Sequence, residues 1–330
     1  MSKKKQKKTN LKSAILLLLL MALLLITSSY AWFTANQTVT VSTLQVNVKA
    51  SNGLQISADA TNWKTVLDKQ DLVTAAGNYQ TLINQLPETD LEPVSTTGNV
   101  TDGKMDMFYG VAEADDTGVY KLTATKQTEA TGTTGKYIAF DLFLKVDNDT
   151  TIYMTPNSNV KMVGDDNKGL QNAARVGFVT EGHKTVDVDP GTIRALSSNE
   201  AAQIWEPNYD VHTAAGVAAA RDTYGLTTTT TGGTKLDYYG IKAAIATGDN
   251  ITMQQLNTST ASPSDTFFSK VTTKWATTAN NTATPEFAQL SAGVTKIRVY
   301  MWVEGQDVDC ENSASGSDIT FDLQFTATAP

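Results

Sequence analysis

Apolar and polar residues alternate strictly in a segment close to the end of this chain. From Ile319 to Phe325 every second residue is a large apolar one, and the residues between them are Thr, Asp and Gln. Successive side chains of a β-strand point to opposite faces, so this period of two predicts a strand with one buried face. Strands of this kind are typical of antiparallel sheets that pack on one side and meet water on the other.

Similar patterns recur along the chain, whereas helical periodicity is sparse. Part of 68–86 and one or two turns within 197–205 are the candidate helices. Tracts rich in Thr, Gly and Asn at 123–135, 227–234 and 269–285 are expected to be loops or insertions. The expected strands are 38–50, 53–57, 119–125, 137–146, 152–163, 175–180, 295–303 and 319–327. The sequence therefore predicts an all-β fold: a jelly-roll-like antiparallel β-sandwich with long Thr/Gly-rich loop insertions and little helix.

The first 31 residues have the composition of an export leader. Six lysines and no acidic residue precede thirteen consecutive apolar residues from Ala14 to Ile26, and a short polar run leads to Ala31. This order matches a signal peptide with cleavage between Ala31 and Trp32. If the apolar stretch is extended to Phe33, an uncleaved N-terminal membrane anchor is the alternative. Both place residues 32–330 outside the cytoplasm, secreted or at the cell surface, and limit membrane contact to the leader.

Without the leader the chain is strongly acidic. The six lysines leave with residues 1–31, so 20 basic residues face 34 acidic ones and the net charge is −14. Such a charge argues against nucleic acid and anionic membranes as partners. The expected partners are other copies of the chain or other surface and matrix proteins.

Residues 32–330 are expected to form a single β-sandwich domain, with an insertion or subdomain at about 186–290. Cys310 is the only cysteine, so no disulfide can form within the chain. An exported protein without disulfides suggests a bacterial exterior. Cys310 is expected to be a small buried or loop residue, with intermolecular pairing or a reactive thiol as alternatives.

Catalytic and metal-binding motifs are missing from the sequence. His183 and His212 have no H-E-x-x-H or C-x-x-C context, and both are expected to be ordinary loop or surface residues. Acidic pairs at 165–166, 187–189 and 307–309 lack the EF-hand pattern, which leaves a structural calcium ion only as a weak alternative to solvated turns. The tryptophans at 63, 205, 275 and 302 are expected in the core or at its rim. We therefore expect no cofactor and no enzymatic activity.

Both ends of the chain resemble a known family. The leader runs directly into Tyr-Ala-Trp-Phe-Thr-Ala-Asn (30–36) and then Val-Ser-Thr-Leu-Gln-Val-Asn-Val (41–48). This junction resembles the TasA/camelysin-like exported proteins of Firmicutes. The stretches 297–312 and 316–325 are similar to the closing strands of surface proteins in that Gram-positive group, and 174–178 and 204–208 to their mid-chain signatures. The regions 60–135 and 210–290 carry no resemblance.

The resemblance implies a subunit of the cell surface or biofilm matrix that can polymerise into fibres, the N-terminal strand of one subunit completing the sheet of the next. The residues permit this, since an extended segment can add to an exposed sheet edge. The candidate assembly strand carries Val39, Val41, Leu44, Val46 and Val48, with a bulge expected at Ser42–Thr43 where the alternation slips. The alternative is that the strand pairs within its own sheet.

Two other functions are open at this point. One is a surface adhesin or binding module that acts through 186–290. The other is an enzyme, either a carbohydrate-active hydrolase or the metallopeptidase activity attributed to camelysin-like proteins, for which this sequence offers no ligand set.

Overall fold

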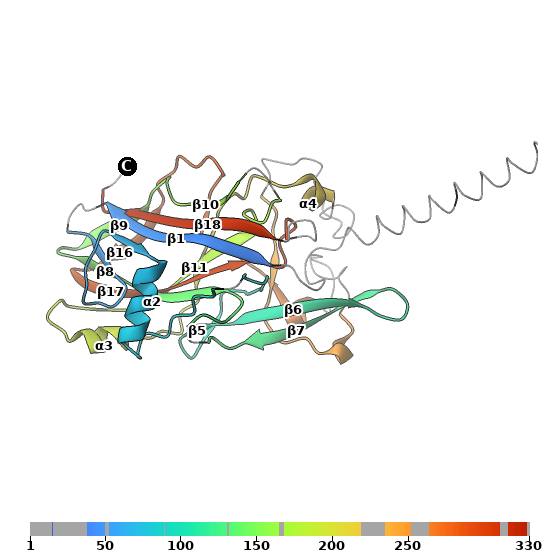
Figure 1. Cartoon of the computed structure of the whole chain (residues 1–330), viewed down its shortest axis with the longest axis horizontal. Coiled ribbons are helices and arrows are strands. Elements are labelled where there is room, and N and C mark those ends of the chain that lie inside the picture. The colour runs from blue at the N-terminus through green and yellow to red at the C-terminus, as the bar shows by residue number, and fades with distance from the viewer. Residues whose placement is uncertain are drawn as a thin grey trace, which may run out of the picture.

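The body of the protein is a β-sandwich (Figure 1). The computed structural model describes residues 38–49, 53–88, 90–130, 132–164, 168–218, 235–251, 264–310 and 316–328, together with Ile15. Within these residues two six-stranded sheets face each other, and short helices and two-stranded sheets surround them. The predicted all-β sandwich is therefore confirmed.

The first sheet contains both the first and the last strand of the chain, and we call it the terminal sheet. Its order is β16-β9-β18-β1-β3, and β10 also pairs with β18. The strands are β1 (Val39–Lys49), β3 (Val66–Asp68), β9 (Thr150–Met154), β10 (Asn159–Met162), β16 (Glu286–Leu290) and β18 (Ser317–Thr326).

The second sheet, which we call the central sheet, has the order β15-β12-β11-β17-β8-β2. Its three long strands β11, β17 and β8 pair antiparallel along most of their length. The strands are β2 (Gln55–Ser57), β8 (Ile138–Val146), β11 (Ala174–Lys184), β12 (Gln203–Glu206), β15 (Trp275–Ala276) and β17 (Gly293–Val303).

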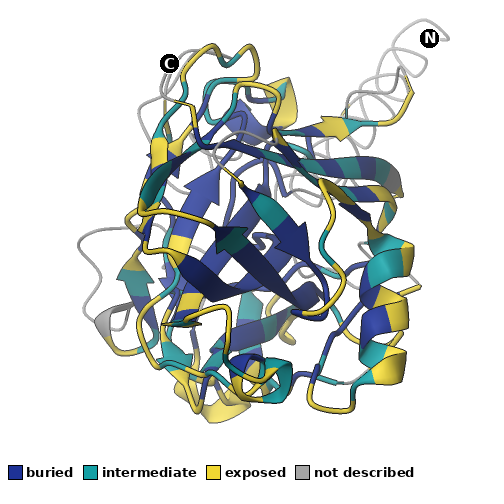
Figure 2. Ribbon diagram, turned by 90° about the vertical axis from the view of Figure 1, so that its left-hand side faces the viewer, coloured by how far each residue is buried: buried dark blue, intermediate teal, exposed yellow. Residues whose placement is uncertain are grey.

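Aromatic rings connect the facing sides of the two sheets. Phe178 of β11 lies edge-on to Phe287 of β16, with 4.9 Å between the ring centroids, and Phe287 lies 4.6 Å from Phe325 of β18. Figure 2 shows the buried strands of this core in dark blue, with exposed turns around them. Burying such rings removes large apolar areas from water, so this layer is the main source of stability.

The outer face of the central sheet, turned away from the terminal sheet, is buried too. Tyr300 and Trp302 of β17 pack there against Val94, Met105 and Tyr238 from the segments that cover the sheet. The β6–β7 hairpin projects from one end of the molecule (Figure 1). The remaining elements are β4 (Val100–Thr101), β5 (Lys104–Met105), β6 (Met107–Ala114), β7 (Tyr120–Gln127), β13 (Tyr239–Ile241), β14 (Phe268–Lys270), α2 (Lys69–Asn78), α3 (Pro190–Arg194), α4 (Ala214–Ala218), α5 (Ser264–Phe267) and the 3₁₀ turn η2 (Thr247–Asp249).

Most predicted strands are confirmed, and the exceptions have local causes. The segment 152–163 is two strands, because a turn at Pro156 separates β9 from β10 and proline cannot donate to a sheet ladder. The helix expected within 197–205 is wrong, since 203–206 forms β12 against β11. Part of 68–86 is helical as expected: α2 (Lys69–Asn78) is capped by Asp68, whose carboxylate accepts a 2.9 Å hydrogen bond from the Asp71 backbone N–H.

Two strand pairings depart from the expected antiparallel pattern. The first strand β1 and the last strand β18 run parallel, and so do β12 and β15. In both cases the partners are far apart in sequence, so no tight turn fixes their relative direction.

Parts of the interval 186–290, the expected insertion, join both main sheets. Strands β12 and β15 extend the central sheet, and β16 forms one edge of the terminal sheet. Trp205 and Trp302 are fully buried, Trp275 is buried and Trp63 is half-buried, which confirms their expected place in the core or at its rim.

The expected leader and its cleavage site at Ala31 and Trp32 lie outside the described residues, Ile15 excepted. Over the part of the chain that the structure describes, no helix has the length and apolar character needed to cross a membrane.

Candidate functional site

The candidate assembly strand β1 lies inside its own sheet. It pairs in parallel with β18 over ten residue pairs, from Val39 with Ser317 to Lys49 with Thr326. On its other side β1 pairs with β3 only at Gln45–Asn47, and Val39 exchanges two backbone hydrogen bonds of 2.9 and 2.6 Å with Leu91. The continuous contact between the first and last strands, which we call the β1–β18 seam, is thus the main attachment of β1.

Four of the five predicted assembly residues are buried: Val39, Leu44, Val46 and Val48, whereas Val41 is half-buried. The register shifts between Val41 and Thr43, so the predicted bulge is confirmed. The bulge adds one residue and moves the apolar set from odd to even positions, which keeps both halves of the strand facing the core.

A polar contact accompanies the seam on the opposite face of the strand. Asn47 Nδ2 donates a 2.9 Å hydrogen bond to Asp322 Oδ1 of β18. Burial raises the pKa of Asp322, and the Asn47 hydrogen bond offsets part of that rise. The seam therefore combines a backbone ladder, an apolar face and a side-chain hydrogen bond that fixes its register.

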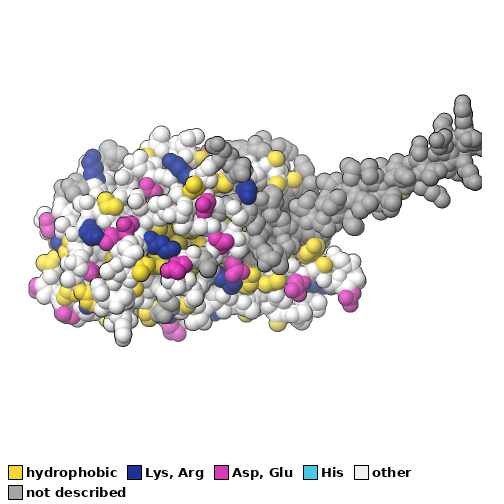
Figure 3. Space-filling view, viewed as in Figure 1, with side chains coloured by type: hydrophobic (Ala, Val, Ile, Leu, Met, Phe, Trp, Pro, Cys, Tyr) yellow, Lys and Arg dark blue, Asp and Glu magenta, His cyan; other side chains and the backbone are white. Residues whose placement is uncertain are grey.

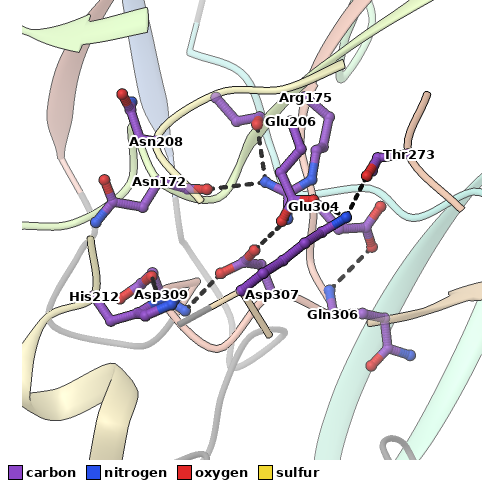
Figure 4. Close-up of polar contacts among 12 residues, drawn as sticks. Asn172, Arg175, Glu206, Asn208, His212, Thr273, Glu304, Gln306, Asp307 and Asp309 are labelled. Atoms are coloured by element: carbon purple, nitrogen blue, oxygen red, sulfur yellow. Dashed lines mark hydrogen bonds and ion pairs between the residues drawn. The ribbon is translucent and has the colours of Figure 1, made fainter. Parts of the chain in front are cut away.

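A network of charged residues lies at one end of the central sheet's outer face (Figure 4). The buried Arg175 guanidinium of β11 donates hydrogen bonds to Glu206 Oε1 at 3.0 Å and to Asp307 Oδ2 at 2.5 Å. Burial alone would lower the pKa of Arg175, but the charges of Glu206 and Asp307 raise it above its ordinary value. Arg175 therefore stays charged, and the network is held together by ion pairs.

The connection between β17 and β18 supplies the rest of this network. Glu304 accepts from the Trp302 indole N–H at 3.0 Å and from the Gln306 backbone N–H at 3.1 Å. Burial raises the pKa of Glu304 to about 7, against the effect of hydrogen bonds from Ser95 and Trp302. These contacts hold residues 304–310 against the sheet.

The two histidines occupy different environments. His183 is exposed on β11, as expected, and its Nε2 lies 3.2 Å from the Ala292 carbonyl oxygen. His212 lies in the loop before α4, one of its two expected placements, and is buried there, with Nδ1 2.7 Å from Asp309 Oδ2. The carboxylate of Asp309 also accepts from the Thr213 backbone N–H at 2.8 Å, which attaches the start of α4 to residues 304–310.

The predicted acidic pairs serve as caps and ion-pair partners in the described residues. Asp189 caps α3 through the Thr192 backbone N–H, and Asp307 and Asp309 belong to the network above. The pair at 165–166 lies outside the described residues. Among the residues that are described, no group of three or more His, Cys, Asp or Glu side chains could hold a metal ion. Cys310, which was expected to be a small buried or loop residue, is fully buried next to Asp309 of this network.

A second charged group, missed by the sequence analysis, lies further along the same outer face. Arg298 of β17 donates to Asp141 of β8 at 2.7 Å and also pairs with Glu129. Lys296 lies beside them and pairs with Asp141 at 3.2 Å. The available signal was that Arg298 and Asp141 interrupt otherwise apolar strands, because a charge in such a position requires a partner.

No protein-family model matches this sequence, and no curated protein or solved structure is significantly similar to it.

Proposed function

We propose that the chain is an exported, non-enzymatic structural protein of the cell surface or extracellular matrix, whose copies join by exchanging β1. The β1–β18 seam is the observation that carries this proposal. β1 begins at Val39, shortly after the expected leader, so export and any cleavage after Ala31 would leave this strand close to the start of the mature chain. The resemblance to TasA/camelysin-like proteins supports the same reading.

The geometry of the seam suits strand exchange. All ten β18 partners of β1 belong to the opposite end of the chain, whereas on its other side β1 pairs with β3 at three residues and makes further backbone hydrogen bonds through Val39 and Val48. A β1 strand from a second copy could make the same ladder and fill the same apolar positions. Exchange from copy to copy is a head-to-tail contact, which produces filaments where it does not close into a ring.

The described charged groups support a structural role for the outer face. Arg175, Glu206 and Asp307 are buried and form ion pairs with one another, as do Arg298 and Asp141. On the face shown in Figure 3, acidic and basic side chains are interspersed and form no single-sign patch. Such a surface favours contact with other proteins over nucleic acid.

Strand complementation tests the proposal. A truncated chain that begins at Gly53 should bind a synthetic peptide of residues 38–49, and the chain 32–330 should form filaments at high concentration under the electron microscope. A peptide carrying Val46→Asp should fail to bind, because it places a charge in the apolar core. The matched peptide with Thr43→Asp, at an exposed position of the same strand, should still bind. Strict monomers at all salt and pH conditions, with no peptide binding, would refute the exchange.

A second candidate function, the binding of a polar ligand, is favoured by one cavity. A hollow of about 360 Å³ lies between 156–161 and 277–281, and its lining includes the side chains of Asn157, Asn159 and Asn281. Amide groups are suited to hydrogen-bonding the hydroxyl groups of a glycan. An adhesin of this kind should bind on a glycan array and lose binding with Asn281→Ala, whereas a fibre subunit should show neither effect.

A further inference from the structure

Lys296 and Asp141 form a buried contact between two neighbouring strands. In the β8–β17 ladder Arg298 pairs with Asp141, so Lys296, two residues earlier on β17, is the diagonal neighbour of Asp141 on the same face. Lys296 Nζ lies 3.2 Å from Asp141 Oδ2, and the two side chains are 8% and 2% exposed. A lysine amine and a carboxyl group are thus held together away from water.

Neighbouring groups fix both partners in place. Lys296 Nζ donates to the carbonyl oxygens of Arg194 at 2.9 Å and Leu196 at 2.8 Å. Arg298 Nη1 donates to Asp141 Oδ1 at 2.7 Å, so the two oxygens of this carboxylate have different partners. Oδ1 faces a permanent positive charge and Oδ2 faces the amine.

A third carboxyl group, Glu181, lies beside this pair. Glu181 occupies the bulge of β11 between Thr180 and Gly182, opposite Ile297 and Lys296 of β17. Bulges re-aim a side chain, and here the carboxyl is buried on the same face. Its Oε2 accepts a 3.2 Å hydrogen bond from the Ser198 backbone N–H, whereas no hydrogen bond within the described part of the chain reaches Oε1.

All four side chains line one cavity of about 180 Å³, which is bounded on another side by the turn 102–104. Burial raises the pKa of Glu181 to about 7, and the charge of Lys296 lowers it while that of Asp141 raises it again. Glu181 can therefore hold or release a proton near neutral pH, next to groups whose charges it senses.

We propose that Lys296 and Asp141 condense to an isopeptide bond that joins β17 to β8 covalently. Through a water molecule in the cavity, Glu181 takes a proton from the Lys296 ammonium and passes it to Oδ2 of the Asp141 carboxylate. The neutral amine then attacks Cγ, and Arg298 stabilises the negative charge that develops on Oδ1. Glu181 then moves one of the two protons on the nitrogen to Oδ2 in the same way, the Cγ–Oδ2 bond breaks to release water, and the amide nitrogen keeps the other proton. A carbon–nitrogen bond replaces a carbon–oxygen bond, one water leaves, and no oxidant or reductant takes part.

Two physical arguments favour the reaction at this place. Holding the partners in contact corresponds to an effective concentration of roughly 10⁵–10⁸ M for a well-oriented pair. Condensation also turns two buried charges into a neutral amide, which removes a desolvation cost. With Cys310 as its only cysteine, the chain cannot use a disulfide for the same purpose.

Peptide mapping of the purified full chain tests the proposal. Proteolysis under denaturing conditions, followed by tandem mass spectrometry, should find the peptides of Lys296 and Asp141 joined and lighter than their sum by one water. The half-exposed pair Lys136–Glu92 serves as the internal control and should yield separate peptides. Separate, unmodified peptides for Lys296 and Asp141 in folded protein would overturn the proposal.

Glu181→Gln distinguishes an assisted reaction from accidental cross-linking. This variant keeps both reacting groups but cannot carry the proton, so the joined peptide should disappear. Its fold is checked by circular dichroism, and Lys296→Arg, which keeps the positive charge, should also abolish the link. A joined peptide at the wild-type yield in Glu181→Gln would refute the role of Glu181. Because these measurements do not depend on assembly, their outcome is separate from that of the strand-exchange experiment.

Discussion

The guanidinium of Arg175 lies 2.5 Å from the carboxylate of Asp307, and both side chains are buried. Arg175 comes from the start of β11, an interior strand of the central sheet, and Asp307 from the connection that leads to β18. Because Glu206 binds the same guanidinium, one cation holds two separate segments against the sheet.

Replacing Arg175 should therefore destabilise the fold severely. Arg175→Met leaves the carboxylates of Glu206 and Asp307 buried without their cation, and removing one partner of a buried pair costs about 3–5 kcal/mol. The free energy of unfolding from urea denaturation measures this loss. Lys270→Met is the matched control, because its ion pair with Asp237 is about half exposed and should be worth less than roughly 1 kcal/mol. Equal losses in the two variants would contradict a stabilising role for the network.

Glu304 should make the stability of the protein depend on pH. Burial raises its pKa to about 7, above the ordinary value of 4.5, so the folded protein retains a proton that the unfolded chain releases. The stabilising effect is complete below about pH 4.5 and is lost as the pH rises through about 7. Glu304→Gln does not titrate at this position. Relative to this variant, the free energy of unfolding of the wild type should fall by roughly 3 kcal/mol at most between pH 4.5 and pH 8.

Urea denaturation of both proteins at several pH values between 4.5 and 8 measures this difference. Glu113→Gln, at an exposed position of β6, serves as the control and should run parallel to the wild type. If the free energies of unfolding of the wild type and Glu304→Gln differed by the same amount at every pH, Glu304 would have the same pKa in the folded and unfolded states, and the prediction would be wrong.

Gly240 should tolerate no side chain. A Cβ added there would lie 1.9 Å from the Thr96 carbonyl oxygen and 2.9 Å from Val271 Cγ2, so the backbone of β13 would have to move. Gly240→Ala is expected to cost at least about 1–3 kcal/mol, as for overpacking in a core. Gly248→Ala, with no atom within 4 Å of the new Cβ, should lie within roughly 1 kcal/mol of the wild type. Thermal unfolding of both variants tests the contrast, and similar melting temperatures would argue against the close approach.

The fold was predictable where one strand face alone is buried. Two signals were local: the alternation of apolar and polar residues in β18, and the shift of the apolar positions of β1 at Ser42. Each follows from side chains that point alternately into and out of the sandwich. Strand β12 was not predictable, because its state is decided by pairing with β11 and not by its own sequence. The parallel direction of the β1–β18 seam has the same cause, since its two strands lie at opposite ends of the chain.

The ion pairs of the central sheet's outer face could not be predicted from the sequence either. Arg175 lies 31 residues from Glu206 and 132 from Asp307, and Arg298 lies 157 from Asp141. A charge within an apolar strand indicates that a partner exists, but spacing cannot identify a partner that the tertiary fold supplies. The burial of His212 within its loop was not predictable for the same reason, because it depends on Asp309, 97 residues away.

Val46 of β1 should contribute more to stability than Val66 of β3, which pairs with the next residue of β1, Asn47. Val46 is 1% exposed and faces the core, whereas Val66, on β3, is 46% exposed. Val46→Ala removes buried methyl groups and leaves a cavity, which should cost roughly 2 kcal/mol, whereas Val66→Ala should cost less than about 0.5 kcal/mol. Urea denaturation of the monomer gives both values, and equal losses would place Val46 outside the core. If copies exchange β1, the same methyl groups are buried in the monomer and in the assembly. Val46→Ala should then weaken the monomer without shifting the balance between monomer and filament, which sedimentation of the two variants at matched concentration can test.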